Sequence, residues 1–378
     1  MTDRPLDRPF QEEHMTENQA PSPSTAPAPD HAARRRAVGR RIAAAGAHQL
    51  LVTDLMNVRY LTGFTGSNAA LLLATDGEGV IATDGRYDTQ VRQQTSGLDI
   101  RITRDLFREL TAAAGDEAVH IEPQLAVGRA RDLGDPEILG GTVEAERLVK
   151  DDAELAALTA AGELADAVFV EFIEAGGIRE GITEIEAAAD LEHRLRRAGA
   201  DGLSFDTILA SGTNAAKPHA GVSRERIVPG LVTVDFGVYL DGYASDETRT
   251  VCVGEPDARS RELFDLVHTA FTAGVQTLAP GVAGRDVDAA ARRVIADAGY
   301  GEYFVHSTGH GVGLDVHEAP SASTRAADRD VLREGMTLTV EPGVYLPGET
   351  GLRIENTYII TADGARTCNP SPTELRVV

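Results

Sequence analysis

The chain has 378 residues, enough for two domains, and its hydrophobic content of 42% is ordinary for a globular protein. Its formal net charge is −23 at pH 7. Such an acidic surface repels phosphate backbones and anionic lipids, so we expect neither a nucleic-acid nor a membrane partner. The two cysteines, Cys252 and Cys368, are too few for a disulfide framework and suit a reducing cytoplasm, although a single disulfide between them stays open.

The first 30 residues differ in composition from the rest. Residues 20–30 alternate proline with small residues and offer nothing to bury, so we expect a disordered tail over residues 1–30. Acidic residues stand where a signal peptide needs a basic and then an apolar segment, and Met15 is an alternative start. The longest apolar runs are too short to span a bilayer. We therefore expect a cytoplasmic protein.

Residues 31–148 carry an α/β pattern. A basic amphipathic segment predicts a helix over residues 31–45 that stops near Gly46. Short apolar runs predict strands at 49–53, 69–74 and 79–83, and the stretches between and after them predict helices at 86–94 and 105–114. Because no catalytic cluster falls here, we interpret this half as an α/β domain that serves as a scaffold or a subunit contact.

A second domain is expected over residues 149–378, beginning near Lys150. Thr183 and Glu186 have the spacing of a capping box, which supports the start of a helix there. Strands and hairpins are expected after Gly202, so this half is of the α+β class. The helical patterns cover residues 153–174, 183–198, 258–279 and 285–298.

An internal repeat is the most informative feature of the sequence. Residues 233–242 read TVDFGVYLDG, and residues 339–348 read TVEPGVYLPG, with seven of ten positions identical. This identity predicts two structurally equivalent hairpins. Each hairpin has an acid on its first strand, Asp235 or Glu341, among apolar strand residues.

Each hairpin also carries a second acid on its return strand, Asp246 in the first and Glu355 in the second. An unpaired carboxylate among apolar residues costs on the order of several kcal/mol. Carboxylates that are brought together also repel one another and take up protons. A pair of divalent cations removes both problems. The alternative is four solvated acids at strand ends.

Histidines strengthen the case for a metal site. Residues 306–318 read HSTGHGVGLDVHE, which places His306, His310 and His317 in a glycine-rich segment, and His219 lies in a KPH sequence. Glycine lets a backbone pass close to a ligand. Mixed carboxylate and imidazole ligands suit Mn²⁺, Co²⁺, Fe²⁺ or Zn²⁺, and the absence of thiolates argues against a structural zinc site.

In order and spacing, five of these residues resemble the metal ligands of the pita-bread metallopeptidases, the group of methionine aminopeptidase, aminopeptidase P, prolidase and the metal-free creatinases. The segments SFDTILASG, KPHA, HSTGHGVGLDVHEAP and VEPGVY resemble the Xaa-Pro branch. NVRYLTGFTGSN, at residues 57–68, resembles a creatinase-type N-terminal domain. The resemblance implies an α+β pita-bread fold for the second domain. The five matching residues are Asp235, Asp246, His310, Glu341 and Glu355.

The resemblance implies a dinuclear metal hydrolase that cuts the peptide bond before proline in small peptides. Asp246 and Glu355 would bridge two divalent ions. Asp235 would bind one ion, and His310 with Glu341 would bind the other. Mn²⁺ is the expected metal, with Co²⁺, Fe²⁺ or Zn²⁺ as alternatives, and a homodimer is the expected assembly.

The resemblance also assigns catalytic and substrate-binding roles. Glu341 would move the proton between water and the leaving nitrogen, and His317 would donate to the scissile carbonyl oxygen. His219 would contact the substrate near the scissile nitrogen, and His306 would line the proline pocket. Arg353 would orient a ligand or bind a substrate carboxylate, unless its bonding is purely structural.

Several alternatives stay open. Thr248, two residues after Asp246, would support a ligand or make a plain structural bond. Dipeptidase and aminopeptidase P activities are hard to separate, and Ser321 stands where some prolidases carry an arginine for a dipeptide's carboxylate. A non-catalytic or creatinase-like pita-bread protein is the remaining alternative, which the complete ligand set disfavours.

Overall fold

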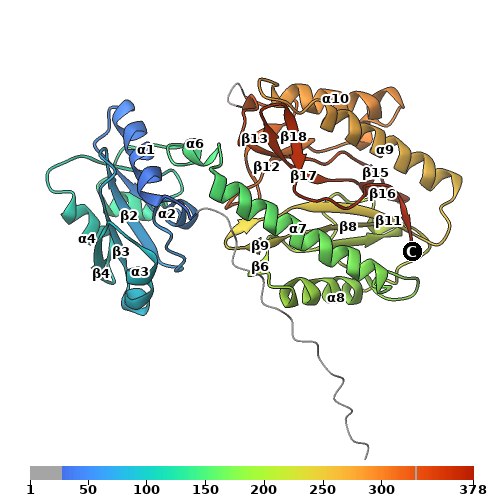
Figure 1. The fold of residues 1–378 in the computed structure, drawn as a ribbon, viewed down its shortest axis with the longest axis horizontal. Helices are drawn as coiled ribbons and strands as arrows, with labels where there is room; N and C mark the ends of the chain where they lie inside the picture. Colours follow the sequence, from blue (N-terminus) through green and yellow to red (C-terminus); the bar gives the residue numbers. More distant parts are fainter. Residues whose placement is uncertain (1–27, 328–329) are drawn as a thin grey trace, which may run out of the picture.

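The structure is a computed structural model that describes residues 28–327 and 330–378. Two lobes are joined by α6 (Glu144–Arg147) and the start of α7 (Asp152–Glu174), as Figure 1 shows. The disordered tail predicted over residues 1–30, with Met15, lies outside the described residues except for residues 28–30. The domain boundary predicted between residues 148 and 149 falls between these two helices and stays a prediction.

The first lobe is built around a five-stranded mixed sheet with the order β4-β3-β2-β1-β5. Alternate residues of β1 and β2 point to opposite faces, so each face buries its own apolar core. Helices α1 and α2 pack on one face, and α4 packs on the other. The strands are β1 (Gln49–Val52), β2 (Ala69–Ala74), β3 (Gly79–Thr83), β4 (Asp99–Ile102) and β5 (Val119–Ile121). The helices are α1 (His31–Ala44), α2 (Leu55–Thr62), α3 (Asp88–Gln94), α4 (Leu106–Ala113) and α5 (Val127–Asp132).

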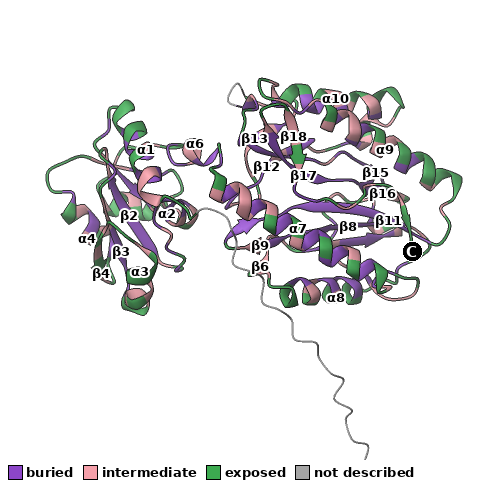
Figure 2. Ribbon diagram, in the orientation of Figure 1, coloured by how far each residue is buried: buried purple, intermediate pink, exposed green. Residues whose placement is uncertain are grey.

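The second lobe repeats one arrangement twice, in which a pair of helices precedes a long hairpin. Helices α7 and α8 (Glu184–Arg197) form one apolar core with the first hairpin, and α9 (Ala258–Gln276) and α10 (Gly284–Asp297) form another with the second hairpin. In Figure 2 the strands between the helix pairs are buried, while the outer faces of the helices are exposed. The strands are thus held between two helical layers.

The sequence repeat does form two equivalent hairpins. In the first, β8 (Gly230–Phe236) pairs with β11 (Glu247–Val253), and β9 (Val238–Leu240) pairs with β10 (Tyr243–Ala244). In the second, β14 (Thr337–Val340) pairs with β17 (Asn356–Thr361), and β15 (Gly343–Leu346) pairs with β16 (Thr350–Arg353). An isolated bridge between Thr248 and Glu355 joins the two hairpins. The remaining strands are β6 (Gly202–Leu203), β7 (Ile208–Ser211), β12 (Gly309–Gly311), β13 (Glu318–Ala322), β18 (Gly364–Thr367) and β19 (Arg376–Val377).

Cys252 and Cys368 are both buried and free, so the disulfide left open by the sequence does not form here. Within residues 28–327 and 330–378, no helix combines the length and the apolar character that crossing a bilayer requires.

Candidate metal centre

The predicted site residues converge in one cavity of the second lobe. The cavity has a volume of about 720 Å³ and receives side chains from both hairpins. Its lining includes every residue that the sequence singled out as a ligand or a substrate contact: Asp235, Asp246, His310, Glu341, Glu355, His219, His306, His317 and Arg353.

Each hairpin consists of two successive pairs of strands, and the four acids lie at the junctions between these pairs. Asp235 is the penultimate residue of β8, and Glu341 directly follows β14. Asp246 directly precedes β11, and Glu355 directly precedes β17. Because the ladders are interrupted there, these side chains face the cavity from two hairpins at once. The duplicated sequence therefore supplies four carboxylates to one place.

Two glycines let the histidine-bearing strand β12 pass close to its neighbours. A Cβ atom on Gly309 would lie 1.9 Å from the carbonyl oxygen of Thr339, and one on Gly311 would lie 2.2 Å from that of Ala319. Neither separation is sterically allowed, so any larger residue would push β12 away. These glycines hold His310, between them, against the end of β14.

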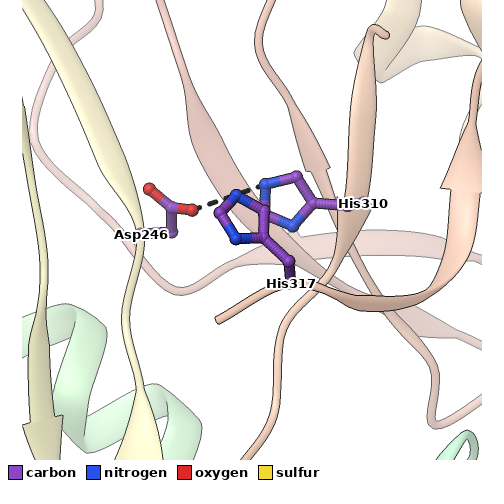
Figure 3. A group of neighbouring side chains, drawn as sticks. All are labelled: Asp246, His310 and His317. Atoms are coloured by element: carbon purple, nitrogen blue, oxygen red, sulfur yellow. Dashed lines mark ion pairs between the residues drawn. The ribbon is translucent and has the colours of Figure 1, made fainter. Parts of the chain in front are cut away.

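Candidate metal donors form three overlapping groups, each with ligand atoms within 4.8 Å of one another. One group, Asp246, His310 and His317, is drawn in Figure 3, where the two imidazole rings lie side by side and the carboxylate faces them. The other two groups are His310 with Glu341 and Glu355, and Asp235 with Asp246 and Glu355. The shared members indicate one cluster that can hold more than one cation.

The hydrogen bonds of His310 fix its tautomer. Its Nδ1 lies 3.0 Å from the carbonyl oxygen of Gly311, which can only accept, so Nδ1 carries the proton. The unprotonated Nε2 then faces the acids, at 3.5 Å from Asp246 Oδ2 and 3.4 Å from Glu341 Oε1. Burial lowers the pKa of His310 and favours this neutral form. In metal sites, a hydrogen bond donated by the ring nitrogen that does not bind the metal commonly orients the histidine.

Electrostatic repulsion within the cluster is strong in the absence of cations. Burial, followed by repulsion from neighbouring carboxylates, raises the pKa of Asp246 and of Glu355 well above its ordinary value. Burial also raises the pKa of Glu341 to about 7. The metal-free site therefore tends to hold protons, and divalent cations are the natural replacement for them.

Asp235 provides a direct test of whether the site fits metal ions. Its Oδ1 atom is buried and has no hydrogen-bond partner among the described residues, although an orphaned buried acceptor costs about 1–3 kcal/mol. A cation at this position would satisfy it. The complete donor set of carboxylate oxygens and imidazole nitrogen, without thiolates, suits Mn²⁺ and similar ions. The residues thus fit a dinuclear metal site.

Arg353 is bound on every side by protein groups. Its Nη2 pairs with Asp235, its Nε donates to Thr248 Oγ1 at 3.1 Å, and its Nη1 donates to Tyr345 Oη at 2.6 Å and to the carbonyl oxygen of Pro218 at 3.2 Å. Arg353 is only 4% exposed. Of the roles expected from the sequence, these bonds are compatible with orienting the ligand Asp235 and with purely structural bonding, but they leave no free nitrogen for a substrate carboxylate.

The remaining predicted residues surround the acids. Thr248 donates from Oγ1 to Glu355 Oε2 at 2.7 Å. His306 contacts Tyr345 Oη through Nε2 at 2.9 Å, and burial lowers its pKa to about 3, so it is neutral. His219 is exposed and lines the same cavity. His317 stands 4.3 Å from His310 between ring centroids.

One residue that supports the site from behind and several that line the cavity were missed from the sequence. Tyr345, which links His306 and Arg353, lies in the repeated GVYL segment, and the repeat was the signal that could have found it. Glu192 of α8, with Phe205 and Asp206, also lines the cavity, but these residues belong to no recognisable motif.

Comparisons with known proteins agree with this geometry. Residues 156–362 match the model of metallopeptidase family M24, and residues 34–133 match the creatinase/prolidase N-terminal domain. An uncharacterized peptidase of Bacillus subtilis, YqhT, is 39% identical over 345 residues, which cover 88% of this chain and 96% of that protein.

Solved structures are similar over nearly the whole fold. An Xaa-Pro dipeptidase from Bacillus anthracis is 37% identical with a TM-score of 0.86, and the match covers 92% of this chain and all of that one (100%). An X-Pro aminopeptidase from Thermotoga maritima is 33% identical with a TM-score of 0.83, over 91% of this chain and 99% of that one. The pita-bread fold and the creatinase-type N-terminal domain expected from the sequence are confirmed. The chain belongs to metallopeptidase family M24.

Proposed function

We propose that this metallopeptidase cleaves the bond before proline in short peptides whose first residue, Xaa, carries a free amine. The convergence of four carboxylates, three of them buried, and one oriented imidazole in a single cavity carries this proposal. Relatives named Xaa-Pro dipeptidase and X-Pro aminopeptidase support the choice of substrate. Mn²⁺ as the ion and a homodimer as the assembly are part of the proposal, to be checked by metal analysis and light scattering.

Asp235, Asp246, His310, Glu341 and Glu355 would hold two cations, with Asp246 and Glu355 shared between them. When bound, the cations would polarise the scissile carbonyl and lower the pKa of the attacking water. Glu341 would accept the proton of that water and pass it to the leaving proline nitrogen.

His317 would donate a hydrogen bond to the carbonyl oxygen as that oxygen gains negative charge. Such a donor typically contributes about 3–4 kcal/mol to lowering the barrier. His306, held by its hydrogen bond to Tyr345, would line the proline pocket, and His219 would contact the substrate near the scissile nitrogen. Arg353 would hold Asp235 in position rather than bind substrate.

The charge of the cavity bears on substrate length. Among the described residues that line it, Arg353 is the one lysine or arginine, and its nitrogen atoms are engaged by protein groups. A dipeptide would place its terminal carboxylate in this cavity without a free cation to receive it. This observation favours peptides longer than two residues, whose carboxylate lies farther out.

The direct test compares kcat/KM for Ala-Pro, Ala-Pro-Ala, Ala-Ala and acetyl-Ala-Pro with Mn²⁺ present. A proline pocket that loses contacts with two or three methylenes, worth about 0.8 kcal/mol each, should discriminate against Ala-Ala by about 10- to 60-fold. Acetylation should abolish cleavage because the free amine is expected beside the carboxylates. Equal rates on Ala-Ala and Ala-Pro would remove the proline assignment. Cleavage of Ala-Pro alone would contradict the preference for longer peptides.

A further inference from the structure

His317 lies between two cavities and not against a packed core. It lines the metal-centre cavity and also a second cavity of about 750 Å³ that is bounded by residues of both lobes. His317 is exposed, and its ring lies beside that of His310, at 4.3 Å between centroids, with no hydrogen bond to any group in residues 28–327 and 330–378. The position of the ring therefore depends on the backbone segment that carries it, residues 315–318.

Two buried basic side chains, those of Arg147 and Lys150, hold this 315–318 segment at both ends. Arg147 donates through Nη2 to Asp315 Oδ2 at 2.6 Å and to Glu318 Oε2 at 2.8 Å. Lys150 donates through Nζ to the other oxygen of Glu318 at 2.7 Å. The side chains of Arg147 and Lys150 are 5% and 1% exposed. Hydrogen bonds between ionised groups are the strong kind, so they fix the residues on either side of His317.

Arg147 also connects this segment to the first lobe. Its Nη1 donates to Asn57 Oδ1 at 2.8 Å, and Asn57 Nδ2 donates to Glu122 Oε1 at 2.7 Å. The other oxygen of Glu122 accepts from the backbone N–H groups of Thr53 and Asp54, at 2.6 and 2.8 Å. A continuous chain of hydrogen bonds thus runs from the end of β1, through α2 and the end of α6, to the segment that carries His317.

We propose that Arg147, supported by Lys150 and Asn57, is a positioning residue that sets the place of His317, and that the first lobe thereby takes part in catalysis. The inference rests on the proposed function, in which His317 stabilises the developing negative charge. Arg147 acts through Asp315 and Glu318 and not on the reacting atoms. A displacement of about 1 Å in a catalytic group can reduce the rate by about 100-fold.

The test compares Arg147→Met with a matched control, Arg34→Met. Arg34 is equally buried and also links the first lobe to α7, through bonds to Asp151 at 2.7 Å and Glu154 at 3.5 Å that do not involve the 315–318 segment. We expect Arg147→Met to lower kcat on the best Xaa-Pro substrate by about 10- to 100-fold, with KM and metal content unchanged. We expect Arg34→Met to lower thermal stability and to leave kcat unchanged. A kcat for Arg147→Met equal to that of the control would overturn the inference.

Repeating Arg147→Met in a His317→Ala background separates positioning from general damage. If Arg147 acts through His317, the second substitution should cause no further loss of kcat, whereas an additive loss would contradict the inference. Failure of the proposed function is distinguishable, because wild type would then cleave Ala-Ala and Ala-Pro at equal rates, whereas failure of the role of His317 would leave kcat unchanged in His317→Ala. If Arg147→Met does not fold, Arg147→Lys replaces it, and its smaller loss of kcat should likewise vanish in the His317→Ala background.

Discussion

Glu341→Gln should stabilise the metal-free protein while it removes activity. Burial raises the pKa of Glu341 to about 7, from an ordinary value of 4.5, because the folded site disfavours the charged form. A raised pKa in the folded state gives stability that is present below pH 4.5 and is lost as the pH rises through about 7. At 1.36 kcal/mol for each pH unit, the cost of ionised Glu341 in the folded protein at pH 8 is about 3 kcal/mol at most.

Urea unfolding of chelator-treated protein at pH 8 and pH 5 measures this cost. Wild type should unfold at a lower urea concentration than Glu341→Gln at pH 8, and the difference should shrink at pH 5, where Glu341 is protonated in the folded state. Mn²⁺ should reverse the order at pH 8, because the ion stabilises the protein that binds it more tightly. Glu334→Gln, at an exposed position, is the control and should change neither curve. If metal-free Glu341→Gln is no more stable than wild type at pH 8, the conclusion that burial destabilises the ionised Glu341 is wrong.

Three further outcomes are expected. His317→Ala should lower kcat by about 100- to 1,000-fold with little change in KM, measured by steady-state kinetics; a pure KM effect would assign His317 to substrate binding. Asp246 belongs to two of the donor groups, so the Asp246→Asn protein should contain less metal by elemental analysis, while its circular dichroism spectrum should match that of wild type. Full turnover with both ions retained would contradict this. Gly309→Ala should reduce stability by about 1–3 kcal/mol in urea unfolding, because its Cβ would overlap Thr339, whereas Gly128→Ala, where nothing lies within 4 Å, should not.

Local signals explain why most helices and several strands were predictable. The strands at residues 69–74 and 79–83 agree with the structure, because each is an apolar run bounded by turn residues. The helix after Thr183 begins there, since Thr183 and Glu186 form the capping box expected from their spacing. The first helix ends just before Gly46, whose φ of 77° suits glycine.

Elements without a local signal were missed. The edge strand β4, with sequence DIRI, is largely exposed and lacks an apolar run, and β5 has only three residues. The repeat revealed the duplicated hairpins, but the helix pairs that precede them share no obvious sequence identity. Their equivalence comes from similar packing on equivalent strands, which sequence composition does not encode.

The residues of the candidate site likewise include some that the sequence could predict and some that it could not. Acids and histidines in unusual surroundings were recognisable because ionisable groups between apolar residues or glycines need an explanation. Arg147 and Asn57 were not, because a buried ion pair depends on a partner far along the chain: Arg147 and Glu318 are 171 residues apart. Tyr345 was missed for a different reason: it lies in the repeated segment, but its importance follows from its hydrogen bonds to Arg353 and His306.

The bridge between Thr248 and Glu355 has a consequence for how the protein matures. These residues are 107 positions apart, and each hairpin contributes only half of the carboxylates. Contacts of such long sequence separation form late in folding, because a large loop must close before they stabilise anything. A chain with one hairpin formed can therefore offer only an incomplete set of ligands. Metal uptake should therefore coincide with the docking of the second hairpin on the first. The bound cation would stabilise only the fully folded lobe, so metal content should distinguish mature protein from partly folded chains.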